Sequence, residues 1–282
     1  KKRYTLEQKK WDSPTERAMP EHSRGPASFT VGNVRIAPAT VLAPMAGVTD
    51  TVFRRFIKNA SQFSAATEAG APRLDSETWV PNVDAGAPGL DSETWAQDVN
   101  AVTSNRQSGC GLIRTEFTSA DGLSRTRESK RKRYLTYYDD EHPISAQLFG
   151  SNPDTLAESA RIVQDAGFDL IDLNLGYPAK SVVACNGGSG LLRDLPQIER
   201  IFRAVRAAVV IPFTVKFRMG WSDAHIVCVE LARLAEDCGL DAVALHARTR
   251  EDGYTGQARW QYIAACKDAV GIPVIGNGDI RT

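Results

Sequence analysis

Leu170-Ile171-Asp172-Leu173-Asn174-Leu175-Gly176 is the stretch that most directly indicates the fold. It follows a segment with helix signals, in which Asn152 can cap, Pro153 can open and Gly167 can end a helix. Runs of the same size recur along the chain: Val41–Gly47, Leu112–Phe117, Ile144–Gly150, Phe213–Gly220, Ala242–Thr249 and Pro273–Ile280. They are too short for helices and rich in aliphatic residues, as strands buried on both faces should be.

Helix-like segments alternate with these runs and end at Gly or before Pro. They cover Gln197–Ala208, Ile226–Cys238 and Trp260–Ala269. Repeated β-α units indicate a parallel sheet with right-handed crossovers. With an eighth strand expected just beyond Thr282, the pattern predicts an α/β fold, a (β/α)8 TIM barrel truncated after about the seventh strand. A doubly wound open sheet is the alternative.

The composition restricts the class of protein. The chain has 282 residues, 34 basic and 34 acidic side chains, 42% hydrophobic residues and 24% charged residues. These values are typical of a soluble globular protein, and the neutral charge argues against a strongly basic nucleic-acid binder, although not against a local basic patch. The five Cys lack disulfide or zinc spacing, and no apolar run is long enough to cross a membrane. We therefore expect a cytoplasmic protein without a metal site. We also expect it to be a monomer.

The two ends of the chain and one internal segment do not follow the alternation of predicted strands and helices. Residues 1–30 are polar and predict an N-terminal extension, and 31–282 predict one partial barrel, which an insertion at about 60–110 interrupts. The insertion is acidic and contains a direct repeat, Ala69–Trp79 and Ala85–Trp95. It predicts a mobile surface loop, or else a docking segment that uses its two Trp. Because the chain lacks an initiator Met and a closing helix, we expect a fragment of a longer protein.

Polar residues cluster at the carboxyl ends of the predicted strands. They are Glu116, Gln147, Asp172, Asn174, Lys216, Arg218, His246, Arg248, Asn277 and Asp279. In a barrel all these ends meet at one rim, where active sites lie. A buried charge costs several kcal/mol unless it is used or paired, so polar ends on six strands indicate a site. The alternative is a ring of salt bridges in which the rim residues satisfy one another.

The residue types at this rim suit a flat, amide-rich ring. Lys216 beside His246 can stabilise negative charge, such as that on the pyrimidine edge of a reduced flavin. Gln147 and Asn174 can form hydrogen bonds with ring amides of flavin or uracil. Gly276–Asp279 resembles half of a barrel phosphate site, and Pro44-Met45-Ala46-Gly47 allows a ring to approach closely.

Eight segments, in order, resemble a known family. They are Ala43–Asp50, Thr115–Phe117, Ala146–Gly150, Asp172–Gly176, Gly187–Leu192, Val215–Arg218, Leu245–Arg248 and Gly276–Asp279. Together they resemble the tRNA-dihydrouridine synthases, bacterial B type. The resemblance implies an FMN-bound barrel that uses NADPH to reduce uridines of tRNA to dihydrouridine. It implies FMN contacts from Pro44, Met45, Ala46, Gln147, Lys216, His246, Asn277 and Gly278. It places Asn174 and Arg218 near the target uracil.

One position departs from the family pattern. The family has a catalytic Cys in an Asn-x-Gly-Cys-Pro motif, whereas this chain has Asn174-Leu-Gly-Tyr177-Pro178. That Cys donates a proton to carbon 5 of uracil after hydride reaches carbon 6. Tyr177 can donate a proton but is larger and less acidic than a thiol. Three hypotheses stay open: Tyr177 is a weak acid, Cys185 in the same loop replaces it, or the protein is impaired.

Two further features bear on the partner. The resemblance implies a C-terminal helical domain that grips tRNA, and we expect that domain to be absent from this chain. The stretch Ser124–Tyr134 carries six cations against one Glu, and it predicts either a solvated helix face or a phosphate contact at the rim. The alternatives to a tRNA-uridine reductase are a catalytically impaired flavin- or RNA-binding remnant and a related flavin barrel that reduces a free pyrimidine.

Overall fold

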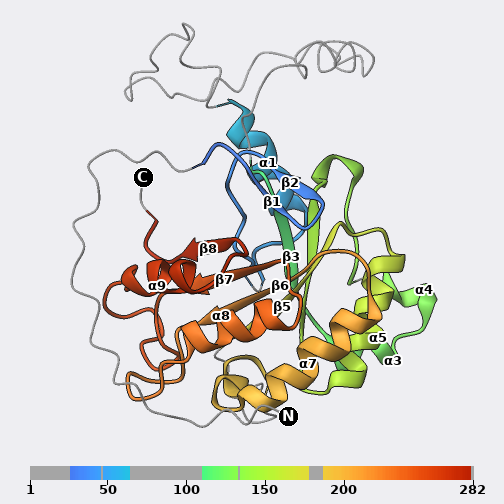
Figure 1. Ribbon diagram of the computed structural model, residues 1–282. Helices are drawn as coiled ribbons and strands as arrows, with labels where there is room; N and C mark the ends of the chain where they lie inside the picture. The colour runs from blue at the N-terminus through green and yellow to red at the C-terminus, as the bar shows by residue number, and fades with distance from the viewer. Residues whose placement is uncertain (1–25, 46, 64–109, 133, 178–186, 281–282) are drawn as a thin grey trace, which may run out of the picture.

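The computed structural model describes residues 26–45, 47–63, 110–132, 134–177 and 187–280 (Figure 1). Most of the N-terminal extension, nearly all of the repeat-containing insertion, Ala46 and Cys185 lie outside these residues. Among the described helices, none is long and apolar enough to cross a membrane.

Six parallel strands form one sheet in chain order. They are β3 (Ile113–Ser119), β4 (Ile144–Phe149), β5 (Leu170–Leu175), β6 (Phe213–Arg218), β7 (Ala242–His246) and β8 (Val274–Asn277). Val41 forms a parallel bridge with Leu112 and so places a seventh segment beside β3. The predicted α/β fold with a parallel, barrel-type strand order is therefore confirmed, with β8 at the seventh strand position. The described strands do not close into a complete barrel.

The prediction of a strand over Val41–Gly47 is wrong in its length, because the paired segment is much shorter. The Leu42 N–H donates to Leu112 O at 3.0 Å, but regular pairing goes no further than this bridge. Pro44 has no N–H to continue the ladder. The backbone then turns, and the Val48 and Thr49 N–H groups both donate to Met45 O. The strand therefore gives way to a loop, which leads directly into the first helix.

Helices follow the strands as the sequence predicts. They are α1 (Thr51–Phe63), α5 (Pro153–Asp165), α7 (Leu195–Ala208), α8 (Cys228–Asp237) and α9 (Gln261–Ala269). Asn152 Oδ1 accepts hydrogen bonds from the N–H groups of Asp154 and Thr155, which confirms the predicted cap of α5. From α5 to α9, each of these helices packs against the next along the outside of the sheet (Figure 1).

An N-terminal hairpin was not predicted. β1 (Phe29–Val31) and β2 (Val34–Ile36) pair antiparallel around Gly32, whose φ of +56° suits glycine. Val31 and Ile36 pack with Leu112, Leu170 and Ala242, so the hairpin covers the end at which the sheet strands begin. The alternating residues around Gly32-Asn33 were the available signal.

The basic stretch forms two short helices after β3. They are α3 (Ala120–Arg125) and α4 (Glu128–Arg131). Ser119 Oγ caps α3 by accepting from the Gly122 N–H at 3.3 Å. The side chains of Arg125, Arg127, Lys130 and Lys132 are exposed, and none of the four pairs with an acid in the described part of the chain. Two short 3-10 helices, η2 (Asp139–Glu141) and η3 (Gly188–Arg193), complete the connections.

Candidate active site

Three neighbouring strand ends bring the predicted rim residues together. In the sheet register Arg218 of β6 lies opposite His246 of β7, and His246 lies opposite Asn277 of β8. Lys216 Nζ donates to Asn277 Oδ1 at 3.1 Å, across the width of β7. The side chains of Lys216 and Asn277 therefore converge at the centre of this edge, as the sequence predicted.

Lys216 is an easily deprotonated cation. Burial lowers its pKa to about 8, and the nearby positive charges of Arg114 and Arg218 act in the same direction. Asp172 opposes this shift but forms no ion pair with Lys216. Because no carboxylate of the described chain neutralises it, Lys216 can offer positive charge to a bound anion.

His246 is neutral near pH 7. Burial, followed by the charges of Lys216, Arg218 and Arg248, lowers its pKa to about 3. Its Nε2 lies 3.4 Å from Arg248 Nη1, which can only donate. The ring proton of the neutral imidazole therefore belongs on Nδ1.

The turn after β8 approaches His246 closely. Gly278 has a φ of +111°, and a Cβ atom on it would lie 3.0 Å from His246 Cδ2. Asp279 accepts from Arg248 Nη2 at 2.9 Å with each carboxylate oxygen. The alternative that rim residues satisfy one another in salt bridges therefore holds for Arg248 and Asp279. Lys216 forms no such salt bridge with another described residue.

Arg218 holds two rim loops in place. Its Nε donates to Gly176 O at 3.2 Å, and its Nη1 donates to Thr249 O and Gly253 O at 3.0 and 2.8 Å. The guanidinium lies 5.4 Å from the ring centroid of Tyr254, which is 78% exposed. Tyr254, an aromatic side chain at the mouth of the site, was not predicted, because a loop residue between glycines belongs to no periodic pattern.

Gln147 and Asn174 form a direct contact. Asn174 Nδ2 donates to Gln147 Oε1 at 2.8 Å. Asn174 is 8% exposed, and Gln147 is fully buried beside it. A ligand can therefore touch Gln147 only if neighbouring side chains move.

Tyr177 lies at the β3 and β4 side of the rim. Its ring centroid is 4.3 Å from that of Phe117 and 6.5 Å from that of Phe149. Its carbonyl oxygen accepts from the N–H and the hydroxyl of Ser189. The segment after Tyr177, including Cys185, lies outside the described residues, so the competing acid hypotheses stay open.

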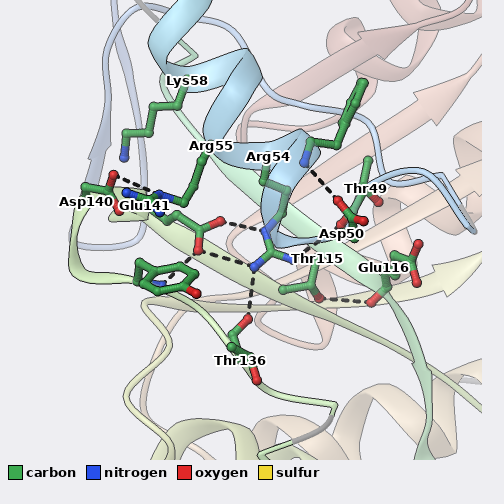
Figure 2. Close-up of polar contacts among 12 residues, drawn as sticks. Thr49, Asp50, Arg54, Arg55, Lys58, Thr115, Glu116, Thr136, Asp140 and Glu141 are labelled. Carbon is green, nitrogen blue, oxygen red and sulfur yellow. Dashed lines mark hydrogen bonds and ion pairs between the residues drawn. The ribbon is translucent and has the colours of Figure 1, made fainter. Parts of the chain in front are cut away.

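The residues just before α1 are joined to a buried ion pair (Figure 2). Thr49 Oγ1 accepts from the Met45 N–H at 3.1 Å, and Met45 is 44% exposed. Arg54 of α1 donates from Nη1 to Thr49 O at 3.3 Å and pairs with Glu141 at 2.7 Å. No hydrogen bond of the described residues joins Pro44 or Met45 to the Lys216 cluster. This ion pair was not predicted, because Arg54 and Glu141 are far apart in the chain.

No metal centre is evident in the described ranges, where no three His, Cys, Asp or Glu side chains are grouped closely enough. Among the described residues, the strand ends bring together the Lys216 cation, the neutral His246 imidazole and the amide of Asn277. These groups can bind an anionic or amide-bearing ring without a metal.

Comparison with known proteins identifies the family. The family model for dihydrouridine synthase (Dus) matches residues 41–282. The chain is 38% identical to tRNA-dihydrouridine synthase B of Xanthomonas campestris over 251 residues, which cover 89% of this chain and 60% of the relative. It is 32% identical to probable tRNA-dihydrouridine synthase 1 of Synechocystis over 94% of this chain and 62% of the relative. The chain thus spans about three fifths of the length of these relatives.

Similar solved structures support the fold alone. A variant of NCR from Zymomonas mobilis superposes with a TM-score of 0.52 at 13% identity, over 90% of this chain and 79% of that one. Histamine dehydrogenase from Rhizobium sp. 4-9 gives a TM-score of 0.51 at 14% identity, over 89% of this chain and 42% of that one. With the family match over most of its length and relatives above 30% identity, the chain belongs to the dihydrouridine synthase family.

Proposed function

We propose that the chain is the flavin-binding catalytic part of an enzyme that uses FMN and NADPH to reduce uridines of tRNA to dihydrouridine. The observation that carries the proposal is the convergence of Lys216, Asn277 and neutral His246 at one strand edge. The family relationship and the names of the curated relatives support the reaction. A cytoplasmic monomer remains our expectation for the assembled protein.

The residues present fit a flavin. Lys216 supplies a positive charge without a competing carboxylate among the described residues, and Asn277 lies within hydrogen-bond distance of it. Gly278 leaves room beside His246, where a side chain would not fit. Pro44, Met45 and Ala46 are the further residues that we propose against the ring. Bound FMN would supply the two-electron chemistry that moves a hydride from NADPH to carbon 6 of uracil.

The chain's own side chains bind the ring, orient the uracil and deliver a proton to it. Lys216 stabilises negative charge on the bound ring, and His246 donates from Nδ1 while staying neutral. Asn174 and Arg218 border the space for the uracil, which must leave its stack in the tRNA to reach the rim. Tyr177 or Cys185 then delivers the proton to carbon 5.

A second candidate is an impaired flavin- or RNA-binding protein. The packing of Tyr177 against Phe117 favours it, since an aromatic cluster is an ordinary structural role for a tyrosine ring. A barrel that reduces a free pyrimidine is less consistent with the four exposed cations of α3, α4 and their flanks, none of which forms an ion pair with another described residue.

One experiment separates these functions. The full-length protein is purified, its flavin is identified by absorbance and chromatography, and dihydrouridine is measured by mass spectrometry after incubation with NADPH and unmodified tRNA. We expect one non-covalent FMN per chain and NADPH-dependent dihydrouridine. A flavin-loaded protein that oxidises NADPH but never modifies tRNA would support the impaired alternative, and a protein that ignores added FMN would contradict the proposal.

A further inference from the structure

Two arginines stack on one tryptophan in the loops that follow the strands. The guanidinium carbon of Arg193, at the end of η3, lies 4.0 Å from the centroid of the Trp221 ring, and that of Arg250 lies 4.7 Å from the same centroid. A guanidinium over an indole is attracted by the face of the ring, and this contact uses none of its N–H groups. The stack therefore holds two sets of hydrogen-bond donors around one aromatic side chain.

Backbone hydrogen bonds join the loops that carry Trp221 and Arg250. The Arg250 N–H donates to Gly220 O at 2.9 Å, and the Glu251 N–H donates to Trp221 O at 3.1 Å. The Trp221 N–H donates to His225 O at 3.1 Å, which closes a short turn. These bonds fix the backbone on both sides of the stack without any contribution from the two guanidinium groups.

The two positive charges are not neutralised within the described part of the chain. Neither Arg193 nor Arg250 forms an ion pair there, and Arg250 Nε is buried without a hydrogen-bond partner among those residues. The carboxylates of the neighbouring loops, Asp223 and Asp252, both pair with Arg259 instead, at 2.6 and 2.8 Å. An indole cancels no charge, so the stack offers two cations to an anion that comes from outside.

The stack lies at the same edge of the sheet as the candidate active site. Trp221 is three residues after Arg218, which ends β6. Arg250 follows Thr249, whose carbonyl oxygen accepts from Arg218 Nη1 at 3.0 Å. Arg193 ends η3, in the connection that leaves the carboxyl end of β5. A ligand that extends out of the site therefore has these two cations within its surroundings.

We propose that Arg193, Trp221 and Arg250 form a binding site for a phosphate group of a nucleotide. A guanidinium presents paired N–H donors that match phosphate oxygens, and stacking restricts the side chain before the anion arrives. The inference rests on the proposed function only for the source of the phosphate, which is the RNA backbone or the dinucleotide reductant. Both sources present the same chemistry, and the experiments below separate them.

Pyrophosphate tests the site without either substrate. The full-length protein is titrated with pyrophosphate while tryptophan fluorescence is recorded, since an anion beside the stack changes the emission of Trp221. We expect a saturable change in the wild type, which Arg193→Gln/Arg250→Gln and Trp221→Phe both remove. Arg161→Gln/Arg203→Gln is the matched control and should keep the change, because its two exposed cations are each paired with an acid on their own helix.

Two further measurements identify the source of the phosphate. If RNA supplies it, filter binding of unmodified tRNA should show a slope of log affinity against log salt that falls by roughly one to two in Arg193→Gln/Arg250→Gln. If the reductant supplies it, the KM for NADPH in flavin reduction should rise at least roughly tenfold in this variant, while the salt dependence of tRNA binding stays at its wild-type value.

A purely structural role for the stack gives a different pattern. The double variant would then lose stability in urea unfolding but keep the wild-type affinity for pyrophosphate, tRNA and NADPH, and the inference would be wrong. Pyrophosphate binding that affects neither tRNA nor NADPH would also overturn it. Arg193→Lys/Arg250→Lys keeps both charges without the planar donors, so it should bind pyrophosphate more weakly than the wild type and more tightly than the Gln variant.

Two outcomes need separate treatment. If Arg193→Gln/Arg250→Gln does not accumulate, Arg193→Gln alone decides by the same readouts, because Arg193 is exposed and its loss leaves the loop backbone intact. A wild-type protein that binds pyrophosphate and tRNA through these residues, yet makes no dihydrouridine, would contradict the proposed function and not the phosphate site.

Discussion

Arg54 Nε lies 2.7 Å from Glu141 Oε1 with both side chains almost completely buried, whereas the neighbouring pair, Arg55 and Asp140, is about half exposed at 3.2 Å. Two ion pairs, each between an arginine and a carboxylate, therefore join α1 to η2, one of them buried and the other exposed (Figure 2). The buried pair also bonds to the loop that leads from Met45 to α1, through Thr49 O.

The two pairs should differ in their effect on stability. Glu141→Gln removes the carboxylate that neutralises the buried Arg54 charge, leaving it only carbonyl and amide acceptors among the described residues, and should lower the free energy of unfolding by about 3–5 kcal/mol. Asp140→Asn should change it by about 0–1 kcal/mol, since water screens the exposed pair. Urea unfolding followed by circular dichroism measures both. Equal losses in the two variants would contradict the argument from burial.

Lys216 should give FMN binding a pH dependence. Its folded-state pKa of about 8 lies below its ordinary 10.5, so its positive charge is lost as the pH rises through about 8. FMN affinity should fall over that range, and the contribution of this group to stability should rise, since the unfolded chain retains the proton to higher pH. Fluorescence titration from pH 7 to 9.5 compares the wild type with Lys216→Arg and Lys216→Met.

The two variants have distinct expected profiles. Lys216→Arg should bind FMN with little change over this range because a guanidinium stays charged, and Lys216→Met should bind weakly at every pH. If Lys216→Met keeps the wild-type affinity and the fall near pH 8, another group carries the effect.

The basic patch, defined as Arg125, Arg127, Lys130 and Lys132, should contact phosphates of the RNA. Phe117 lies against Tyr177 at the candidate site. Helix α3 begins three residues after Phe117 and spans roughly 9 Å, so the patch follows the rim closely in the chain. Lys130→Gln/Lys132→Gln should weaken tRNA binding and reduce the slope of log affinity against log salt by roughly one to two. Filter binding at several salt concentrations measures both quantities.

Arg161→Gln/Arg203→Gln is the matched control, because it removes two exposed cations from α5 and α7, each already paired with an acid on its own helix. It should alter the slope little. If both double variants change the slope equally, the patch has no special role and its cations form a solvated helix face.

Tyr177 should limit the protonation of carbon 5. Tyr177→Cys should raise dihydrouridine formation at least roughly tenfold, since positioned acid catalysis contributes about 10²–10⁴-fold. NADPH oxidation should be nearly unchanged, because it does not need this group. Tyr177→Phe keeps the ring packing against Phe117 and isolates the hydroxyl. Stopped-flow flavin reduction and mass spectrometry of tRNA measure the two half-reactions.

Cys185→Ala in the Tyr177 background tests the competing hypothesis. If Tyr177→Cys leaves the rate unchanged while Cys185→Ala abolishes it, Cys185 is the acid. If Tyr177→Phe is as active as the wild type, the phenol donates no proton in the slow step.

Local patterns predicted the sheet well because they act within single elements. The apolar runs and the cap at Asn152 depend on neighbours a few residues away, and β5 and α5 formed where those signals lay. The hairpin around Gly32 carried a signal of the same kind, but its three-residue strands were too short to stand out. The strand predicted over Val41–Gly47 is wrong in its length because Pro44 and the turn at Met45 override an apolar composition.

The site was predictable in its residue types and not in its connections. The polar ends of β6, β7 and β8 indicated Lys216, His246 and Asn277, which the sheet register brings together. Arg114 was visible as a charge in an apolar run, yet its approach to Asp172 depends on the reach of a long side chain across neighbouring strands. The hydrogen bond between Asn174 and Gln147 likewise joins two different strands, so no spacing in the sequence reports it.

The hairpin at the N-terminal end of the sheet has a practical consequence. Val31 and Ile36 cover the ends at which the strands start, opposite the edge that carries Lys216 and His246. A bead, a fluorophore or a surface linker attached to an exposed position of the hairpin itself, such as Asn33, would therefore face away from the mouth of the site. Immobilised through that side, the protein would leave its open face accessible to a molecule as large as tRNA, and single-molecule binding could be observed without steric interference from the support.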